Sequence, residues 1–117
     1  MADFIGVMSS INACLNNVNA STNDSMAEPI EKVAKKLDEL KIEYVKKNIF
    51  DGMQLVFPWC EADVVCHSGS YGGKAKLMEV YGNALLTDEE LEEDQVKGYL
   101  TVDDVVERVT KAWKNVE

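Results

Sequence analysis

The first apolar pattern in the chain lies between residues 3 and 18, where apolar residues recur at steps of three and four. Such spacing places them on one face of an amphipathic helix. The stripe consists of Phe4, Val7, Met8, Ile11, Leu15 and Val18. Residues 19–25 are small and polar, which predicts a short linker. We expect the N-terminal arm of residues 1–18 to fold back on its own domain, with docking to a partner or dimerisation as alternatives.

A second helix is predicted to run to about Leu40 or Ile42. Ser25 and Glu28 have the spacing of a capping box, and Pro29 suits the first turn of a helix. Its apolar stripe contains Ile30, Val33, Ala34 and Leu37. The other side carries charges of both signs, which is typical of a solvated face.

From Ile42 the helical period gives way to alternation, which predicts strands. A turn is predicted at Asp51–Gly52, because both residues suit the left-handed backbone of a tight hairpin. Further strands are predicted over residues 53–57, 62–67 and 76–81, the last two joined by the glycine-containing residues 68–73. A hairpin centred on the Gly72–Gly73 or Tyr71–Gly72 pair would bring one set of side chains to a common face, whereas a three-residue loop would change the parity of the register. That set is Val65, His67, Met78 and Val80.

The C-terminal third contains two capping signals. Thr87 with Glu90 predicts a short helix through Glu93, and Thr101 with Asp104 predicts the start of the last helix. Residues 96–100 between them are predicted as a connection or an edge strand. The last helix has an apolar stripe of Val102, Val105, Val106, Val109, Trp113 and Val116. Together these elements predict a single α+β domain over residues 1–117, with two N-terminal helices, a three- or four-stranded antiparallel sheet and a C-terminal helix.

Composition restricts the class of partner. The 117 residues carry a formal net charge of −9, which opposes direct binding to nucleic acid or to an anionic membrane. The N-terminus lacks a basic signal region, and the apolar runs are too short to span a bilayer, so we expect a cytoplasmic protein. Three cysteines without a disulfide framework agree with that location.

His67 is the one histidine of the chain and the first candidate for catalysis. Ser68 or Ser70 could act with it in a small hydrolase, but the segment lacks the G-x-S-x-G nucleophile elbow. Cys66 is its neighbour, and adjacent residues of a regular strand point to opposite faces. Cys60, Cys66 and His67 supply too few ligands for a closed zinc site, so we expect no metal and no cofactor.

Binding residues are predicted in two places. Tyr71 lies at a turn, where its ring would be exposed, and Ser70 and His67 are close to it in the chain. The second place is a run of carboxylates that could face a basic partner. It consists of Asp88, Glu89, Glu90, Glu92, Glu93 and Asp94.

Two segments carry a resemblance to a known group of proteins. The sequence DVVCHSGSYG at residues 63–72, with Glu79 and the sequence GYLTVDDV at residues 98–105, resembles small uncharacterised proteins encoded by phages and prophages of Gram-positive bacteria. The similarity covers about residues 42–112. It implies a phage accessory protein that blocks a host defence, such as an anti-CRISPR-like inhibitor whose carboxylates occupy a basic nucleic-acid channel.

These observations favour a non-enzymatic acidic binding protein. Its expected partner is a host protein with a basic surface, such as a nucleic-acid-binding enzyme, which the acidic segment would occlude while Tyr71 adds specificity. One alternative is a structural homodimer that pairs through the first helix or a spare face of the sheet. The other alternative is the small hydrolase built on His67.

Overall fold

The computed structural model describes residues 26–116 of the chain. Three α-helices are present in this range: α1 (Glu28–Leu40), α2 (Asp88–Glu93) and α3 (Val102–Val116). The strands are β2 (Val45–Ile49), β3 (Gly52–Phe57), β4 (Ala62–Cys66), β5 (Met78–Tyr81) and β6 (Val96–Leu100). Two short 3-10 turns, η2 (Gly73–Ala75) and η3 (Asn83–Leu85), precede and follow β5.

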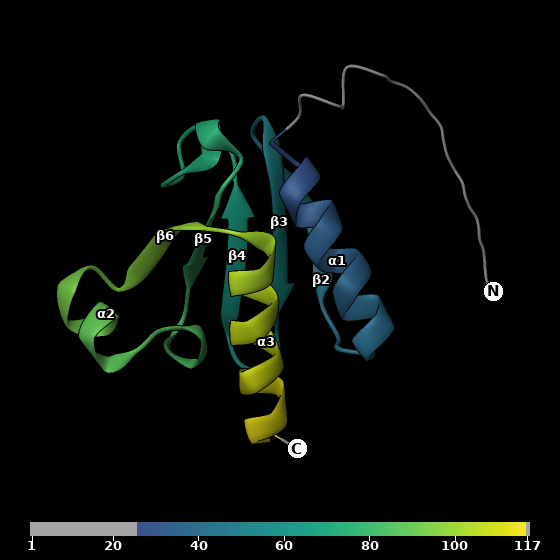
Figure 1. Ribbon diagram of the computed structural model, residues 1–117, viewed down its shortest axis with the longest axis vertical. Helices are drawn as coiled ribbons and strands as arrows, with labels where there is room; N and C mark the ends of the chain where they lie inside the picture. The colour runs from purple at the N-terminus through teal and green to yellow at the C-terminus, as the bar shows by residue number, and fades with distance from the viewer. Residues whose placement is uncertain (1–25, 117) are drawn as a thin grey trace.

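The strands form one antiparallel sheet in the order β2-β3-β4-β5-β6, so every strand pairs with its neighbour in sequence. Helices α1 and α3 lie beside each other on one side of this sheet, and α2 lies beyond its β6 edge (Figure 1). The shortest dimension of the described chain is 19 Å, which corresponds to one layer of helices on one layer of strands. The fold is therefore a two-layer α+β arrangement.

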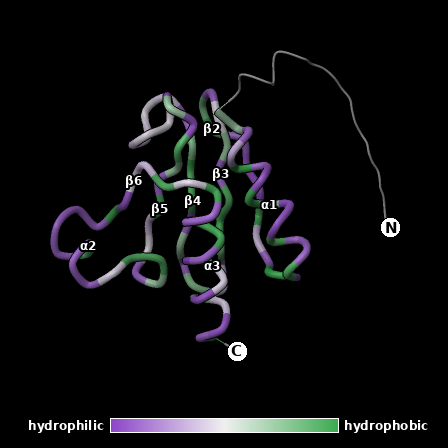
Figure 2. Tube along the Cα trace, viewed as in Figure 1, coloured by the Kyte–Doolittle hydropathy of each residue, from purple (hydrophilic) through white to green (hydrophobic). Residues whose placement is uncertain are grey.

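The hydrophobic core lies between the two layers. The apolar stripes of α1 and α3 meet one face of the three central strands, whose residues on that face are almost fully buried. The largest fully buried side chains of the core are Ile30 and Leu37 from α1 and Phe57, Leu55 and Met78 from the strands. Hydrophobic residues run along the strands in Figure 2, whereas the segment around α2 is mainly hydrophilic. Stability is therefore concentrated beneath α1 and α3.

Several local predictions are confirmed. Thr87 and Glu90 form a reciprocal capping box at the start of α2, and Thr101 and Asp104 exchange the same pair of hydrogen bonds before α3. Pro29 lies in the first turn of α1, which ends at Leu40 because Lys41 adopts a left-handed backbone with a φ of 60°. These signals act over three or four residues, which explains why sequence alone reveals them.

The predicted fold class needs two corrections. The sheet has five strands rather than three or four, because the segment from Val96 to Leu100 pairs with β5 as a full edge strand. The prediction of two N-terminal helices is also wrong for the described residues, in which α1 alone precedes the sheet and α2 lies between β5 and β6. The helix predicted over residues 3–18 and Ser25 lie outside the described range, and the predicted Ser25–Glu28 capping box is wrong, because the N-cap of α1 is Ala27, which makes no side-chain cap hydrogen bond.

The predicted register of the β4–β5 hairpin is wrong by one residue. Val64 pairs with Val80 and Val65 pairs with Glu79, so Val65 and Val80 lie on opposite faces. The connection contains the 3-10 turn η2 instead of a two-residue turn, and this changes which side chains point toward the helices. Buried Cys66 consequently lies on the core side.

The β2–β3 turn is also displaced by one residue from its predicted position. Ile49 pairs with Gly52, which leaves Phe50 and Asp51 as the two turn residues. Phe50 takes the left-handed backbone, with a φ of 51°. Gly52 is needed in the strand because a Cβ atom there would overlap the carbonyl oxygen of Cys66 on β4.

Candidate functional site

A groove of about 390 Å³ lies where the end of α2, strand β6 and the loop after β4 meet. We call it the acidic groove. It is lined by Tyr71, Glu90, Glu93, Asp94, Val96, Lys97, Gly98 and Tyr99. Tyr71 and the acidic segment, which were predicted separately from the sequence, therefore contribute to one site.

Strand β6 contains an irregularity that shapes the groove. Met78 pairs with Leu100 and Val80 with Lys97, so Gly98 and Tyr99 together oppose Glu79. This two-against-one arrangement is a β-bulge, and Tyr99 in it adopts a left-handed backbone with a φ of 59°. Tyr99 is 66% exposed. The bulge thus directs a large aromatic ring toward solvent at the edge of the sheet.

Three contacts hold Tyr71 against the bulge. Its backbone N–H donates to Glu79 Oε1 at 2.7 Å, and its carbonyl oxygen accepts from the N–H of Tyr99 at 3.2 Å. A Cβ atom at Gly98 would overlap the Cβ of Tyr71, so only glycine permits this approach. The backbone of Tyr71 is therefore fixed while the residue as a whole stays 52% exposed.

Helix α2 is attached to the domain through Glu90. Arg108 on α3 donates to Glu90 Oε1 at 2.8 Å and to Oε2 at 2.9 Å, and it also donates to the carbonyl oxygen of Leu85 at 2.7 Å. The bidentate hydrogen bonds from Arg108 lower the pKa of Glu90 to about 2. Glu90 is thus ionised at neutral pH, and it positions the exposed carboxylates of Glu93 and Asp94 at the groove.

The structure brings together some of the predicted binding residues and separates others. Tyr71, Glu90, Glu93 and Asp94 share the acidic groove. Asp88, Glu89 and Glu92 are exposed on α2 but do not line it. They add negative charge near the groove without forming its wall.

His67 and Ser70 do not line the acidic groove, although Ser70 directly precedes Tyr71 in the chain. The Ser70 hydroxyl accepts from the backbone N–H of His67 at 3.0 Å and donates to its carbonyl oxygen at 2.8 Å. His67 Nδ1 accepts from the N–H of Gly69 at 3.0 Å. None of these three bonds joins a serine hydroxyl to the imidazole ring, and burial raises the pKa of the neighbouring Cys66 thiol to about 11. These contacts stabilise the turn.

The imidazole of His67 instead faces the tip of the β2–β3 hairpin. Its ring lies 5.0 Å from that of Phe50, which is 89% exposed. A hollow of about 400 Å³ is lined by these two rings with Asp51, Ser68 and Gly69. The N–H of Ser68 donates to Asp51 Oδ1 at 2.9 Å, and this bond and a second hydrogen bond from Ser68 lower the pKa of Asp51. The hairpin tip and the serine-rich turn are thereby linked.

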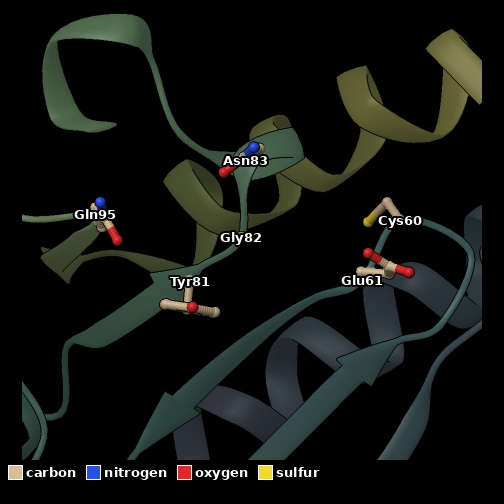
Figure 3. Close-up of a pocket in the computed structure, with 6 residues that line it drawn as sticks. All are labelled: Cys60, Glu61, Tyr81, Gly82, Asn83 and Gln95. Atoms are coloured by element: carbon tan, nitrogen blue, oxygen red, sulfur yellow. The ribbon is translucent and has the colours of Figure 1, made fainter. Parts of the chain in front are cut away.

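A third hollow, of about 330 Å³, lies at the opposite end of β4. Cys60 and Glu61 from the β3–β4 turn approach it from one side and Gln95 from the other, with Tyr81, Gly82 and Asn83 between them (Figure 3). Burial raises the pKa of the Cys60 thiol, so the thiol is protonated at neutral pH. The lining supplies polar groups but no activated nucleophile.

Comparison of the chain with protein-family models, with curated proteins and with solved structures finds no match. Among residues 26–116, no group of three or more histidine, cysteine, aspartate or glutamate side chains is arranged to hold a metal ion. Within the same range, none of the helices has the length and apolar character required to cross a bilayer.

Sequence reasoning missed Tyr99, Lys97, Gly98 and Val96 as residues of the groove. The relevant signal was present, because a Gly-Tyr pair inside a short strand is compatible with a bulge. The pair alone does not reveal that Tyr71, 27 positions before Gly98, packs on that glycine. That contact depends on the tertiary fold.

Proposed function

We propose that this protein is a non-enzymatic binding protein whose acidic groove covers a basic surface of a partner protein. The observation that carries the proposal is the meeting of two exposed tyrosines, Tyr71 and Tyr99, with Glu93 and Asp94 in one groove. These residues come from a loop, an edge strand and a helix end that are separate in sequence.

The chemistry of the groove suits a cationic side chain, because Glu90 is paired with Arg108 and the two other carboxylates of the lining, Glu93 and Asp94, outnumber its cation Lys97. An arginine guanidinium can stack on a tyrosine ring, and its five N–H groups can donate hydrogen bonds to carboxylates. Glu93 and Asp94 offer such carboxylates beside the rings. A lysine ammonium would gain the charge attraction but lacks the planar shape that stacks on an aromatic face. The preferred contact is therefore an arginine on the partner.

The charge of the whole chain supports the same class of partner. A formal net charge of −9 attracts a basic protein over long distances and repels nucleic acid. In the finer form of the proposal, the protein is a phage accessory inhibitor that occupies the nucleic-acid channel of a host defence enzyme. The resemblance of residues 63–72 and 98–105 to phage-encoded proteins motivates this form.

Capture of partners from a lysate of a Gram-positive bacterium tests the class of partner. The full chain is immobilised, and retained proteins are identified after washing at about 0.1 M and about 1 M salt, between which the Debye length falls from about 10 to about 3 Å. We expect basic nucleic-acid-binding proteins that are retained at low salt and released at high salt. Retention that ignores salt would contradict occlusion by charge.

Matched substitutions test the location of the site. The double variant Glu93→Gln/Asp94→Asn removes two charges from the groove, and the control Glu39→Gln/Glu43→Gln removes two exposed charges near the end of α1. We expect the groove variant to weaken binding of the captured partner at least about tenfold, equal to about 1.4 kcal/mol, and the control to change it less than about twofold. Equal losses would mean that net charge rather than the groove binds the partner.

A further inference from the structure

The face of the sheet turned away from α1 and α3 carries an apolar row that crosses all five strands. The pairing register aligns Val45 with Val56, Val56 with Asp63, Asp63 with Tyr81, and Tyr81 with Val96. We call this side the open face. Within the described residues, both α1 and α3 lie on the other side, and Val45 and Tyr81 remain 45% and 55% exposed. Four of the five positions in the row are thus apolar without a covering layer.

An antiparallel sheet with one solvated face usually carries polar residues on that face. The next row of the open face follows this rule in part, since Lys47, Gln54 and Glu79 flank Val65. The apolar row departs from it. Its single polar residue, Asp63, accepts a hydrogen bond from Gln54, and burial raises the pKa of its carboxyl group. A covering segment on this row should therefore be apolar and should bring no negative charge.

The part of the chain before the described residues has that composition. Residues 4–23 contain no charged side chain, although 28% of the chain is charged. The apolar stripe predicted for residues 3–18 includes Ile11 and Leu15, and a helix of 16 residues is about 24 Å long. Five strands spaced about 4.8 Å apart give the row a length of about 19 Å, so a helix of about 24 Å is long enough to cross it.

The point where the described chain begins allows such a segment to reach the open face. Met26 and Ala27 pack against the core at the start of α1, close to the end of the sheet that holds the β2–β3 hairpin (Figure 1). Residues 19–25 can span up to about 23 Å when extended, which is more than the thickness of a sheet and its side chains. We propose that residues 3–18 bind the open face of their own domain and complete a third layer.

A second copy of the chain fits this face less well. Asp63 lies on β4, the central strand, so a symmetric face-to-face dimer would bring the Asp63 carboxyl groups of both copies together. Like charges in a water-poor interface are unfavourable. The uncharged residues 4–23 avoid this repulsion.

The native Cys14 provides a test in the full chain, because it lies three residues from Ile11 and so near the predicted stripe. Alkylation of Cys14 by a maleimide is followed by mass spectrometry of the digested protein. We expect Cys14 in the folded chain to react at least about tenfold more slowly than in a synthetic peptide of residues 1–22. Equal rates in the chain and the peptide would overturn the proposal.

Two variants connect that protection to the open face. Val56→Lys places a charge in the apolar row and should restore fast labelling, whereas Val116→Lys, an exposed control at the end of α3, should not. Ile11→Asp, outside the described fold, should restore fast labelling even if Val56→Lys prevents folding. Protection that survives Ile11→Asp would overturn the proposal. A dimer would also overturn the proposal. If light scattering gives the full chain a molar mass of twice 13.0 kDa, and Val56→Lys makes it monomeric, a second copy covers the open face instead.

Discussion

The helix-covered face of the sheet and the acidic groove are built in opposite ways. Leu55, Phe57, Val64, Met78 and Val80 on the covered face are fully buried, and regular strand alternation positions them. In the groove, exposed Tyr71 and Tyr99 are positioned by a bulge, a glycine contact and single hydrogen bonds. Burial therefore supplies the stability of this domain, whereas specific local geometry supplies its candidate binding surface.

This difference implies that stability and binding can be changed separately. A core substitution should destabilise the fold without altering the groove, and a groove substitution should alter binding at little cost in stability. Substitutions in either region, and at the contact that joins them, can test the separation.

The largest loss of stability is expected from the core. Phe57→Ala removes a fully buried ring that packs 5.7 Å from that of Trp59. We expect the free energy of unfolding to fall by about 3–5 kcal/mol, measured by urea denaturation followed through tryptophan fluorescence. At a temperature where the variant is still folded, affinity for the captured partner should be unchanged. If the folded Phe57→Ala variant binds the partner more weakly, stability and binding are not separable in this protein.

An intermediate effect is expected at Arg108, which connects the two regions. Arg108→Gln removes the bidentate contact to Glu90 and should lower the free energy of unfolding by about 1.5–3 kcal/mol. The matched control is Lys111→Gln on the exposed side of the same helix. If the control destabilises the protein equally, loss of positive charge rather than loss of the Glu90 contact is responsible.

The same contact predicts a pH dependence. The pKa of Glu90 is about 2 in the folded protein and 4.5 for an ordinary glutamate, so the folded state binds this proton less readily than the unfolded state. The contribution of the pair is fully present above about pH 4.5 and is lost as the pH falls toward 2. We expect Arg108→Gln to flatten the stability profile in that window, and a profile identical to that of the unmodified protein would contradict the assignment.

The smallest effect is expected from relief of backbone strain. Phe50 and Tyr99 both adopt left-handed backbones, which asparagine tolerates better than an aromatic residue does. Phe50→Asn should raise the free energy of unfolding by about 0.5–1 kcal/mol and leave partner affinity unchanged. Tyr99→Asn should also relieve strain but should weaken binding, because Tyr99 lines the groove. If both variants bind the partner with equal affinity, Tyr99 does not contribute to the binding site.

The sequence predicted the elements whose signals are local. The stripe of α1, the capping boxes at Thr87 and Thr101, and the apolar strands β3 and β4 all follow from spacings of a few residues. The fifth strand was less apparent, because β6 contains Lys97 and Gly98 and lies at an edge. The register of β4 and β5 was wrong because η2 adds a turn that glycine content alone does not specify.

The candidate site was predicted in pieces. Tyr71 was singled out by its place in a turn, and Glu93 and Asp94 by their place in a charge run. Their meeting depends on Arg108 holding Glu90 from 18 residues away and on Tyr71 packing against Gly98. Neither long-range contact leaves a local pattern in the sequence, which is why Tyr99 was missed.

The most direct test of the account is to map where on the protein a cationic ligand binds. Backbone amide chemical shifts are recorded while a short peptide of alternating arginine and glycine is added, with the lysine counterpart as a control. We expect saturable shifts at Tyr71, Asp94, Gly98 and Tyr99, and weaker ones with the lysine peptide. Shifts spread equally over Glu39, Glu43 and the other exposed acids, or an absence of shifts at the groove, would contradict the account.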